Sequence, residues 1–254
     1  MTEQRSSAWI RRFHPKPGAE TQLVCFPHAG GAASYYHPLS RAMSAQTEVL
    51  AVQYPGRQDR LGEACIEDIP TLADRIAEEL MLWCEDRRTV LFGHSMGAAV
   101  AFEVALRLES RGVVLAGLVV AGRQAPMIQH DRGTHLATDA ELVRRLRTLN
   151  AVNAEILADA SLLEMVLPTI RSDFRASERY LNTTAPQLRC PITALAGADD
   201  PMVEVREVEA WEKQTSGPFR MRVLSGGHFF LDDHAETLRH ELSPPRPSGL
   251  RGGA

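Results

Sequence analysis

The fold is decided by the stretch Thr89-Val90-Leu91-Phe92-Gly93-His94-Ser95-Met96-Gly97, which leads into an alanine-rich segment ending near residue 109. The β-branched Thr89 and three apolar residues predict a buried strand at 89–92, and the pattern after Gly97 predicts a helix at 98–109. The G-x-S-x-G motif between them needs a turn so tight that both glycine positions leave no room for side chains. Such a turn exposes the Ser95 hydroxyl beside the free N–H groups of the following helix. We therefore predict that Ser95 is a nucleophile.

Strands and helices alternate on both sides of this motif. Helices are predicted at 69–83 and 203–213, and further strands at 23–26, 48–54, 113–121, 191–196 and 219–224. This alternation, with near-continuous apolar strands, is typical of a mostly parallel sheet covered by helices on both faces. The sequence thus predicts an α/β fold in a single domain spanning residues 1–242.

Residues 127–185 interrupt the alternation with helical patterns alone. Two capping boxes, Thr138 with Glu141 and Ser161 with Glu164, predict helix starts within this insert. A helical insert between two core strands is expected to form a lid over the carboxyl edge of the sheet. Residues 1–20 are expected to form a loosely ordered lead-in, and residues 243–254, rich in proline and glycine, a disordered tail.

The base that would activate Ser95 is expected late in the chain, after an acid. His228 follows the strand predicted at 219–224 and the small residues at 225–227. His234 and His240 are rivals, but they fall within a helix predicted at 232–242, where solvated histidines are the usual finding. We predict that His228 is the general base.

The acid follows the strand predicted at 191–196, where Asp199 and Asp200 stand side by side. The spacing G-x-x-D-x-x-V, from Gly197 to Val203, favours Asp200. Asp199 remains the alternative, and Asp200 before Pro201 would also suit a residue that only opens a turn.

An oxyanion site needs two backbone N–H donors. We predict that one comes from Met96, directly after the nucleophile, and the other from Ala29, in the loop Pro27-His28-Ala29-Gly30-Gly31 after an early strand. A plain glycine-rich turn is the alternative for this loop. The histidines His28, His130 and His135 lack partners at ligand spacing, so no metal site and no cofactor are predicted.

Composition narrows the class of protein further. The chain has 254 residues and a formal net charge of -4, which offers no basic field for nucleic acid. No apolar stretch is long enough for a membrane helix, and the N-terminus has no apolar signal segment. Four scattered cysteines favour reduced thiols in the cytoplasm over a disulfide framework.

Four segments in order resemble one family. Cys25-Phe26-Pro27-His28-Ala29-Gly30-Gly31, Tyr54-Pro55-Gly56-Arg57, Gly93-His94-Ser95-Met96-Gly97 and Gly226-Gly227-His228-Phe229 are similar to segments of the type II (external, editing) thioesterases of polyketide synthase and nonribosomal peptide synthetase systems. The resemblance, from about residue 9 to residue 242, implies an α/β-hydrolase fold with a lid. It also implies a cytoplasmic enzyme that hydrolyses acyl groups from the phosphopantetheine arm of acyl or peptidyl carrier proteins.

The same resemblance implies a triad of Ser95, Asp200 and His228, with Ala29 and Met96 at the oxyanion hole. Two other functions remain open from the sequence: a small-molecule esterase or lipase, and a hydrolase-like binding protein without catalysis. The carrier-docking surface is open as well. Three loop arginines are either contacts for an acidic partner or simply solvated: Arg57, Arg60 and Arg123.

Overall fold

The computed structural model describes residues 7–84, 87–149, 157–184 and 187–243. Within these residues, seven strands form one sheet in the order β1-β3-β2-β4-β5-β6-β7. Only β1 is antiparallel to its neighbour; the other adjacent pairs are parallel. This confirms the predicted α/β class. The strands are β1 (Ile10–Arg11), β2 (Thr21–Phe26), β3 (Thr47–Val52), β4 (Arg88–His94), β5 (Leu115–Ala121), β6 (Ile192–Gly197) and β7 (Phe219–Leu224).

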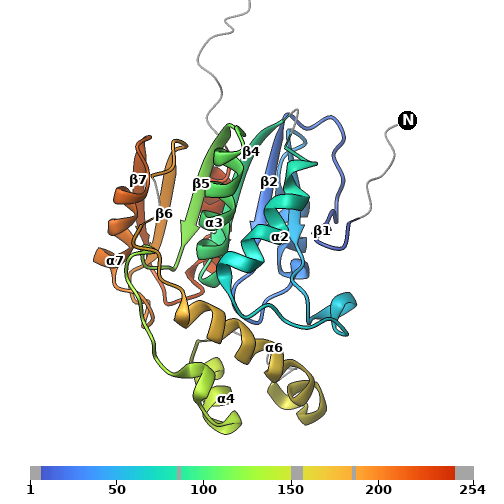
Figure 1. Ribbon diagram of the computed structural model, residues 1–254, viewed down its shortest axis with the longest axis vertical. Helices are drawn as coiled ribbons and strands as arrows, with labels where there is room; N and C mark the ends of the chain where they lie inside the picture. Colours follow the sequence, from blue (N-terminus) through green and yellow to red (C-terminus); the bar gives the residue numbers. More distant parts are fainter. Residues whose placement is uncertain (1–6, 85–86, 150–156, 185–186, 244–254) are drawn as a thin grey trace, which may run out of the picture.

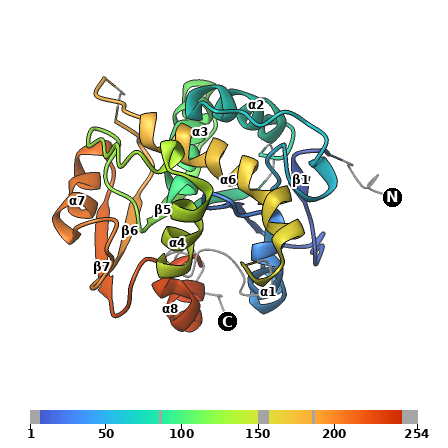
Figure 2. The same ribbon diagram turned by 90° about the horizontal axis from the view of Figure 1, so that it is seen from below.

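Helices cover both faces of the sheet, as the two views together show (Figure 1 and Figure 2). Successive side chains of a strand point to opposite faces, so Leu91 of β4 joins the core beneath α2 and α3 while Phe92 joins the core beneath α1 and α8. Both side chains are at most 1% exposed, which explains the continuous apolar runs. The helices are α1 (His37–Ala42), α2 (Ile69–Met81), α3 (Met96–Ser110), α4 (Asp139–Leu149), α6 (Ala160–Arg179), α7 (Val205–Glu209) and α8 (Ala235–Glu241).

The helical insert lies at the carboxyl edge of the sheet. Figure 1 shows α4 and α6 together at that end, and Figure 2 shows α6 crossing in front of the strand ends. The two helices share a small apolar core, formed by Leu142, Leu146, Leu167 and Ile170. Among the described residues, no helix has both the length and the apolar character that crossing a membrane requires.

One of the two predicted helix caps in the insert is wrong. The hydroxyl of Thr138 accepts from the N–H of Glu141 at 3.3 Å, which is one of the two bonds of the first predicted capping box, whereas the Glu141 carboxylate accepts from Arg145. The helix α6, however, is capped by Asp159, whose carboxylate accepts from the N–H groups of Ser161 and Leu162. An aspartate two residues upstream satisfies the free amides, so Ser161 lies inside the helix.

Three further segments differ from the sequence prediction. The lead-in contains β1, because Ile10 is 5% exposed and pairs with Val52 at the sheet edge. The helix predicted at 203–213 is a short α7 followed by a 3₁₀ helix (Ala210–Gln214). The helix predicted at 232–242 is a 3₁₀ turn (Phe230–Asp233) followed by α8. The tail predicted to be disordered lies outside the described residues from residue 244 onward.

Candidate active site

Ser95 stands at the junction of β4 and α3 with a strained backbone, at φ 55° and ψ -121°. Gly93 and Gly97, on either side of Ser95, are required because the backbone leaves no room for a side chain at these positions. A Cβ on Gly93 would lie 2.1 Å from the carbonyl oxygen of Gly97, and one on Gly97 would lie 2.1 Å from that of Phe26. A non-glycine residue at positive φ is uncommon and clusters at functional sites. The turn therefore holds the Ser95 hydroxyl at the edge of the sheet.

A chain of hydrogen bonds joins the three predicted side chains. His228 Nε2 lies 3.0 Å from Ser95 Oγ, and His228 Nδ1 lies 2.9 Å and 3.1 Å from the two carboxylate oxygens of Asp200. The Asp200 side chain is 1% exposed and also accepts from the N–H of Met202. Asp199 is exposed to solvent, and both carboxylate oxygens near His228 Nδ1 belong to Asp200. The structure thus brings Asp200, and not Asp199, to His228.

The parallel sheet explains why these distant residues meet. Ser95 follows β4, Asp200 follows β6 and His228 follows β7, and all three strands run in the same direction. Their carboxyl ends therefore share one edge, which is where ligands bind in open α/β sheets. The rival histidines lie elsewhere: His234 bonds to Ser225, and the side chain of His240 is 79% exposed.

His94 supports His228 through the main chain. Its Nε2 lies 2.8 Å from the carbonyl oxygen of His228, and because a carbonyl only accepts, His94 donates this bond. Burial and the neighbouring imidazoles hold the pKa of His94 well below its usual range, so the ring is neutral. The sequence analysis did not single out His94 as a functional residue. Its position inside the G-x-S-x-G motif was the only signal, since the contact joins residues 134 apart.

His28 is a second buried, neutral imidazole in this region. Burial lowers the pKa of His28 to about 3, with smaller contributions from His228 and Arg57. Its ring packs edge-on against Tyr35 and Phe229. At neutral pH the region around the active site therefore holds two neutral imidazoles, which do not add positive charge beside His228.

These buried imidazoles predict a loss of stability in acid. In the unfolded chain His28 titrates near pH 6.5, so between pH 6.5 and about 3 the unfolded state binds more protons. The free energy of unfolding then falls with decreasing pH, by up to about 1.4 kcal/mol per pH unit for each such histidine. In urea denaturation between pH 7.5 and 5, a His28→Phe variant should show a shallower fall than the wild type. Parallel curves would contradict the assignment of His28 as a buried neutral group.

The predicted oxyanion loop is a tight turn. The N–H of Gly31 donates to the carbonyl oxygen of His28 at 2.9 Å, and Gly30 has φ +76°. These values define a type II turn with Ala29 and Gly30 at its centre. Met96 is the first residue of α3 and is fully buried. In the part of the chain that the structure describes, neither the Ala29 nor the Met96 N–H donates to a protein acceptor, so both are available to a ligand.

A cavity of about 50 Å³ connects these groups to the lid. Ser95, His228 and Ala29 line it from the sheet, and Phe174, Ser177 and Glu178 of α6 line it from the lid. The reacting groups therefore face a small, partly open space with both apolar and polar walls. Such concave sites at a sheet edge are typical of small-ligand pockets.

Three loop arginines are buried, contrary to both interpretations of the sequence. Arg57, Arg60 and Arg123 are only 7%, 6% and 8% exposed. Arg60 stacks over the ring of Trp9 at 4.1 Å. Arg123 donates to the hydroxyl and carbonyl oxygens of Ser177 in the lid, and burial lowers its pKa to about 10, so it stays charged at neutral pH. None of the three offers its charge on the surface, because the lid and neighbouring loops cover them.

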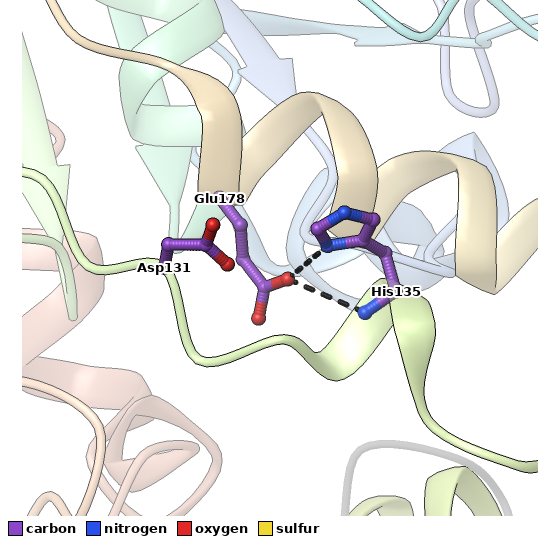
Figure 3. Close-up of side chains that lie close together, drawn as sticks. All are labelled: Asp131, His135 and Glu178. Carbon is purple, nitrogen blue, oxygen red and sulfur yellow. Dashed lines mark hydrogen bonds and ion pairs between the residues drawn. The ribbon is translucent and has the colours of Figure 1, made fainter.

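One cluster has the residue types of a cation site. Ligand atoms of Asp131, His135 and Glu178 lie within 4.8 Å of one another (Figure 3). Glu178 already accepts from the backbone N–H groups of Thr134 and His135, and from His135 Nδ1 at 2.6 Å. These bonds occupy the atoms that a cation would need. We interpret the cluster as structural, because its hydrogen bonds hold the loop at 131–136 against α6.

Comparison with known proteins identifies the family. A family model described as thioesterase domain matches residues 21–243. The chain is 45% identical over 239 residues to the thioesterase PikA5 of Streptomyces venezuelae, covering 94% of this chain and 85% of that protein. It is also 45% identical to a probable cadicidin biosynthesis thioesterase of Streptomyces griseus, covering 95% of this chain but 66% of that protein, which is just under two thirds of its length.

A solved structure gives the same result. The type II thioesterase BorB from the borrelidin biosynthetic cluster superimposes with a TM-score of 0.87 at 46% identity, covering 94% of this chain and 97% of that one. These relatives are thioesterases, which favours neither of the two alternative functions left open by the sequence. The chain therefore belongs to the thioesterase family of α/β-hydrolase enzymes, as a type II thioesterase of polyketide synthase and nonribosomal peptide synthetase pathways.

Proposed function

We propose that the protein hydrolyses acyl thioesters from the phosphopantetheine arm of acyl or peptidyl carrier proteins, with Ser95, His228 and Asp200 as a catalytic triad. The observation that carries the proposal is the continuous hydrogen-bonded chain from the buried Asp200 carboxylate through His228 to Ser95 Oγ. A carboxylate, an imidazole and a hydroxyl in this order are the arrangement that activates a serine for acyl transfer.

In the first half-reaction, Ser95 Oγ attacks the thioester carbonyl while His228 Nε2 takes the hydroxyl proton. Asp200 accepts from His228 Nδ1, which fixes the tautomer of the ring and stabilises the imidazolium that forms. The N–H groups of Ala29 and Met96 donate to the oxyanion of the tetrahedral intermediate, aided by the positive end of α3. The C–S bond then breaks, and the proton held by His228 passes to the departing thiol.

In the second half-reaction, His228 removes a proton from water, and the hydroxide attacks the acyl-serine ester. Collapse of this intermediate releases the carboxylic acid and returns the proton to Ser95 Oγ. Residues of α6 line one side of the cavity, and a bound acyl chain that displaces water from it would strengthen the electrostatic interactions within it. Removal of stalled or misprimed acyl groups from a carrier protein is the biological role that fits such a stand-alone hydrolysis.

The carrier partnership is tested by comparing substrates that share one acyl group. Release of free thiol is measured from a panel of acyl-carrier proteins, from the matching N-acetylcysteamine thioesters and, as released acid, from matching oxygen esters. We expect kcat/KM to be at least ~10-fold higher for the carrier-bound thioester than for the small thioester, because contacts to the carrier and its arm add binding energy. Oxygen esters should react more slowly than either, since an alkoxide is a poorer leaving group than a thiolate.

The same panel contains the outcome that contradicts the proposal. If the carrier confers no advantage and oxygen esters are hydrolysed as fast as thioesters, the protein does not act on carrier-bound substrates. An excess of the carrier without an acyl group serves as the control, because it should compete only if the carrier is recognised.

A further inference from the structure

A buried ion pair connects the lid to the turn that contains Ala29. Arg57 Nη1 and Nη2 donate to the two carboxylate oxygens of Asp173 at 2.7 Å and 2.9 Å. The side chains of Arg57 and Asp173 are 7% and 4% exposed. Asp173 belongs to α6 of the lid, whereas Arg57 follows β3, so the pair joins segments 116 residues apart.

The same carboxylate also holds the turn itself. The N–H of Gly30 donates to Asp173 Oδ2 at 2.7 Å. Arg57 Nη1 in turn donates to the carbonyl oxygen of Gly31 at 2.9 Å. The last two residues of the turn therefore depend on the lid: Gly30 through its amide, and Gly31 through the arginine that the lid carboxylate binds.

The bond to Gly30 acts on the one peptide group that a β-turn can reorient. Rotation of the central peptide, between Ala29 and Gly30, converts a type II turn into a type I turn by changing ψ of Ala29 and φ of Gly30. An acceptor for the Gly30 N–H fixes that peptide and keeps the turn in its type II form. The Ala29 N–H belongs to the preceding peptide, and it is held in place because the turn as a whole is bonded to the lid. Ile170 of α6 adds a steric limit, because a Cβ on Gly30 would lie 2.8 Å from its Cγ1.

Arg57 also neutralises the negative charge of Asp173 beside the oxyanion site. An isolated carboxylate next to the oxyanion site would repel the negative charge that develops there. The bidentate guanidinium cancels most of this charge, and Oδ2, which accepts from Arg57 Nη1, also accepts from the Gly30 N–H. A second bond between lid and loop, from the Thr169 hydroxyl to the carbonyl oxygen of Gly56, keeps the region around Arg57 in place.

We propose that Asp173 is a positioning residue that holds the turn at residues 28–31 in the geometry of the oxyanion hole. The oxyanion hole then forms only when α6 of the lid is packed against the sheet. The proposal rests on the function proposed above, in which Ala29 N–H stabilises the tetrahedral intermediate. Movement of α6 away from the sheet would remove the acceptor of the Gly30 N–H, and the enzyme would then bind an acyl group without activating it.

Two double variants separate the effect of losing the acceptor for the Gly30 N–H from the effect of losing the Arg57–Asp173 ion pair. In Arg57→Met/Asp173→Asn the pair is gone but an amide oxygen can still accept from Gly30. In Arg57→Met/Asp173→Leu a side chain of nearly the same size leaves Gly30 without an acceptor. Replacing a buried ion pair by uncharged groups is often tolerated by the fold, whereas removing one partner is not. Thermal unfolding monitors the fold of both, and Asp159→Ala, which weakens the α6 cap only, controls for general loosening of the lid.

The readouts are kcat and KM for an N-acetylcysteamine thioester, and the inhibition constant of a trifluoromethyl ketone, which forms a tetrahedral adduct with the serine. We expect the leucine variant to have a kcat about 100-fold below that of the asparagine variant at similar KM, since small displacements of a catalytic group have effects of this size. The inhibition constant should rise in parallel. Asp159→Ala should leave the inhibition constant unchanged.

Equal kcat values and equal inhibition constants for the two double variants would overturn the proposal. A parallel rise in the inhibition constant of Asp159→Ala would also overturn it, because any loosening of the lid would then have the same effect. These failures differ from failure of the proposed function, in which the wild type itself would not prefer carrier-bound thioesters. The inhibition constants of the ketone compare the two double variants whether or not the wild type prefers carrier-bound thioesters.

Discussion

Replacing Ser95 by alanine is expected to lower thioester hydrolysis by roughly 10⁴- to 10⁶-fold. In the proposed mechanism the hydroxyl at the end of the Asp200–His228 chain attacks the carbonyl, and alanine leaves the imidazole without a nucleophile to deprotonate. Because the side chain loses one atom at the edge of the sheet, the fold should remain intact. Thiol release and a thermal unfolding curve, measured on the same preparation, check both parts.

A matched control for this prediction is the double variant Ser95→Ala/His228→Ala, compared with each single variant. The two side chains act as a unit, so the double variant should be no less active than either single variant. Multiplicative losses, or a Ser95→Ala protein with more than a few per cent of wild-type turnover, would mean that another group attacks the substrate.

The second large effect is expected at Asp200, with Asp199 as the control on the neighbouring position. Asp200→Asn should lower kcat by about 10⁴-fold, because an amide facing His228 Nδ1 favours the wrong tautomer of the ring and cannot stabilise its cation. The Asn side chain keeps the shape of the site and can still accept from the N–H of Met202. Asp199→Asn should change kcat by less than about twofold, as surface substitutions usually have small effects.

The comparison of these two variants shows which aspartate acts as the acid of the proposed triad. Steady-state kinetics at several pH values separate a change in kcat from a change in the pKa that governs the reaction. A large loss in Asp199→Asn with little change in Asp200→Asn would reverse the assignment and would require the loop at 198–203 to adopt a different arrangement in solution.

The sequence was most informative where structure is local. The strand at 89–92, the tight turn and the helix after it follow from adjacent residues, since each glycine is required by atoms within a few positions or by the neighbouring strand. Chain order and position after a strand were enough to predict Ser95 and His228 as members of one site. The doublet Asp199-Asp200 was harder, because the spacing favoured Asp200 but only the path of the loop decides which of two adjacent aspartates is buried.

The contacts between lid and core could not be predicted from the sequence. Arg57, on a polar loop, resembles a solvated arginine until Asp173 is placed against it by the docking of α6. Arg123 is buried for the same reason, by its bonds to Ser177. Periodicity predicts that a helix exists and which face is apolar, but it does not predict which loop the helix covers. The pairing of Asp173 with Arg57 therefore emerged only from the three-dimensional arrangement.

The central claim is that Ser95 is the one activated nucleophile of the protein, and a fluorophosphonate probe tests it most directly. Intact-mass spectrometry follows labelling while thiol release is measured on the same samples. We predict one label per chain, located on the peptide containing Ser95, with activity lost in proportion to labelling and no label on Ser95→Ala. Full thioesterase activity in completely labelled protein, or equal labelling of Ser95→Ala, would contradict the claim.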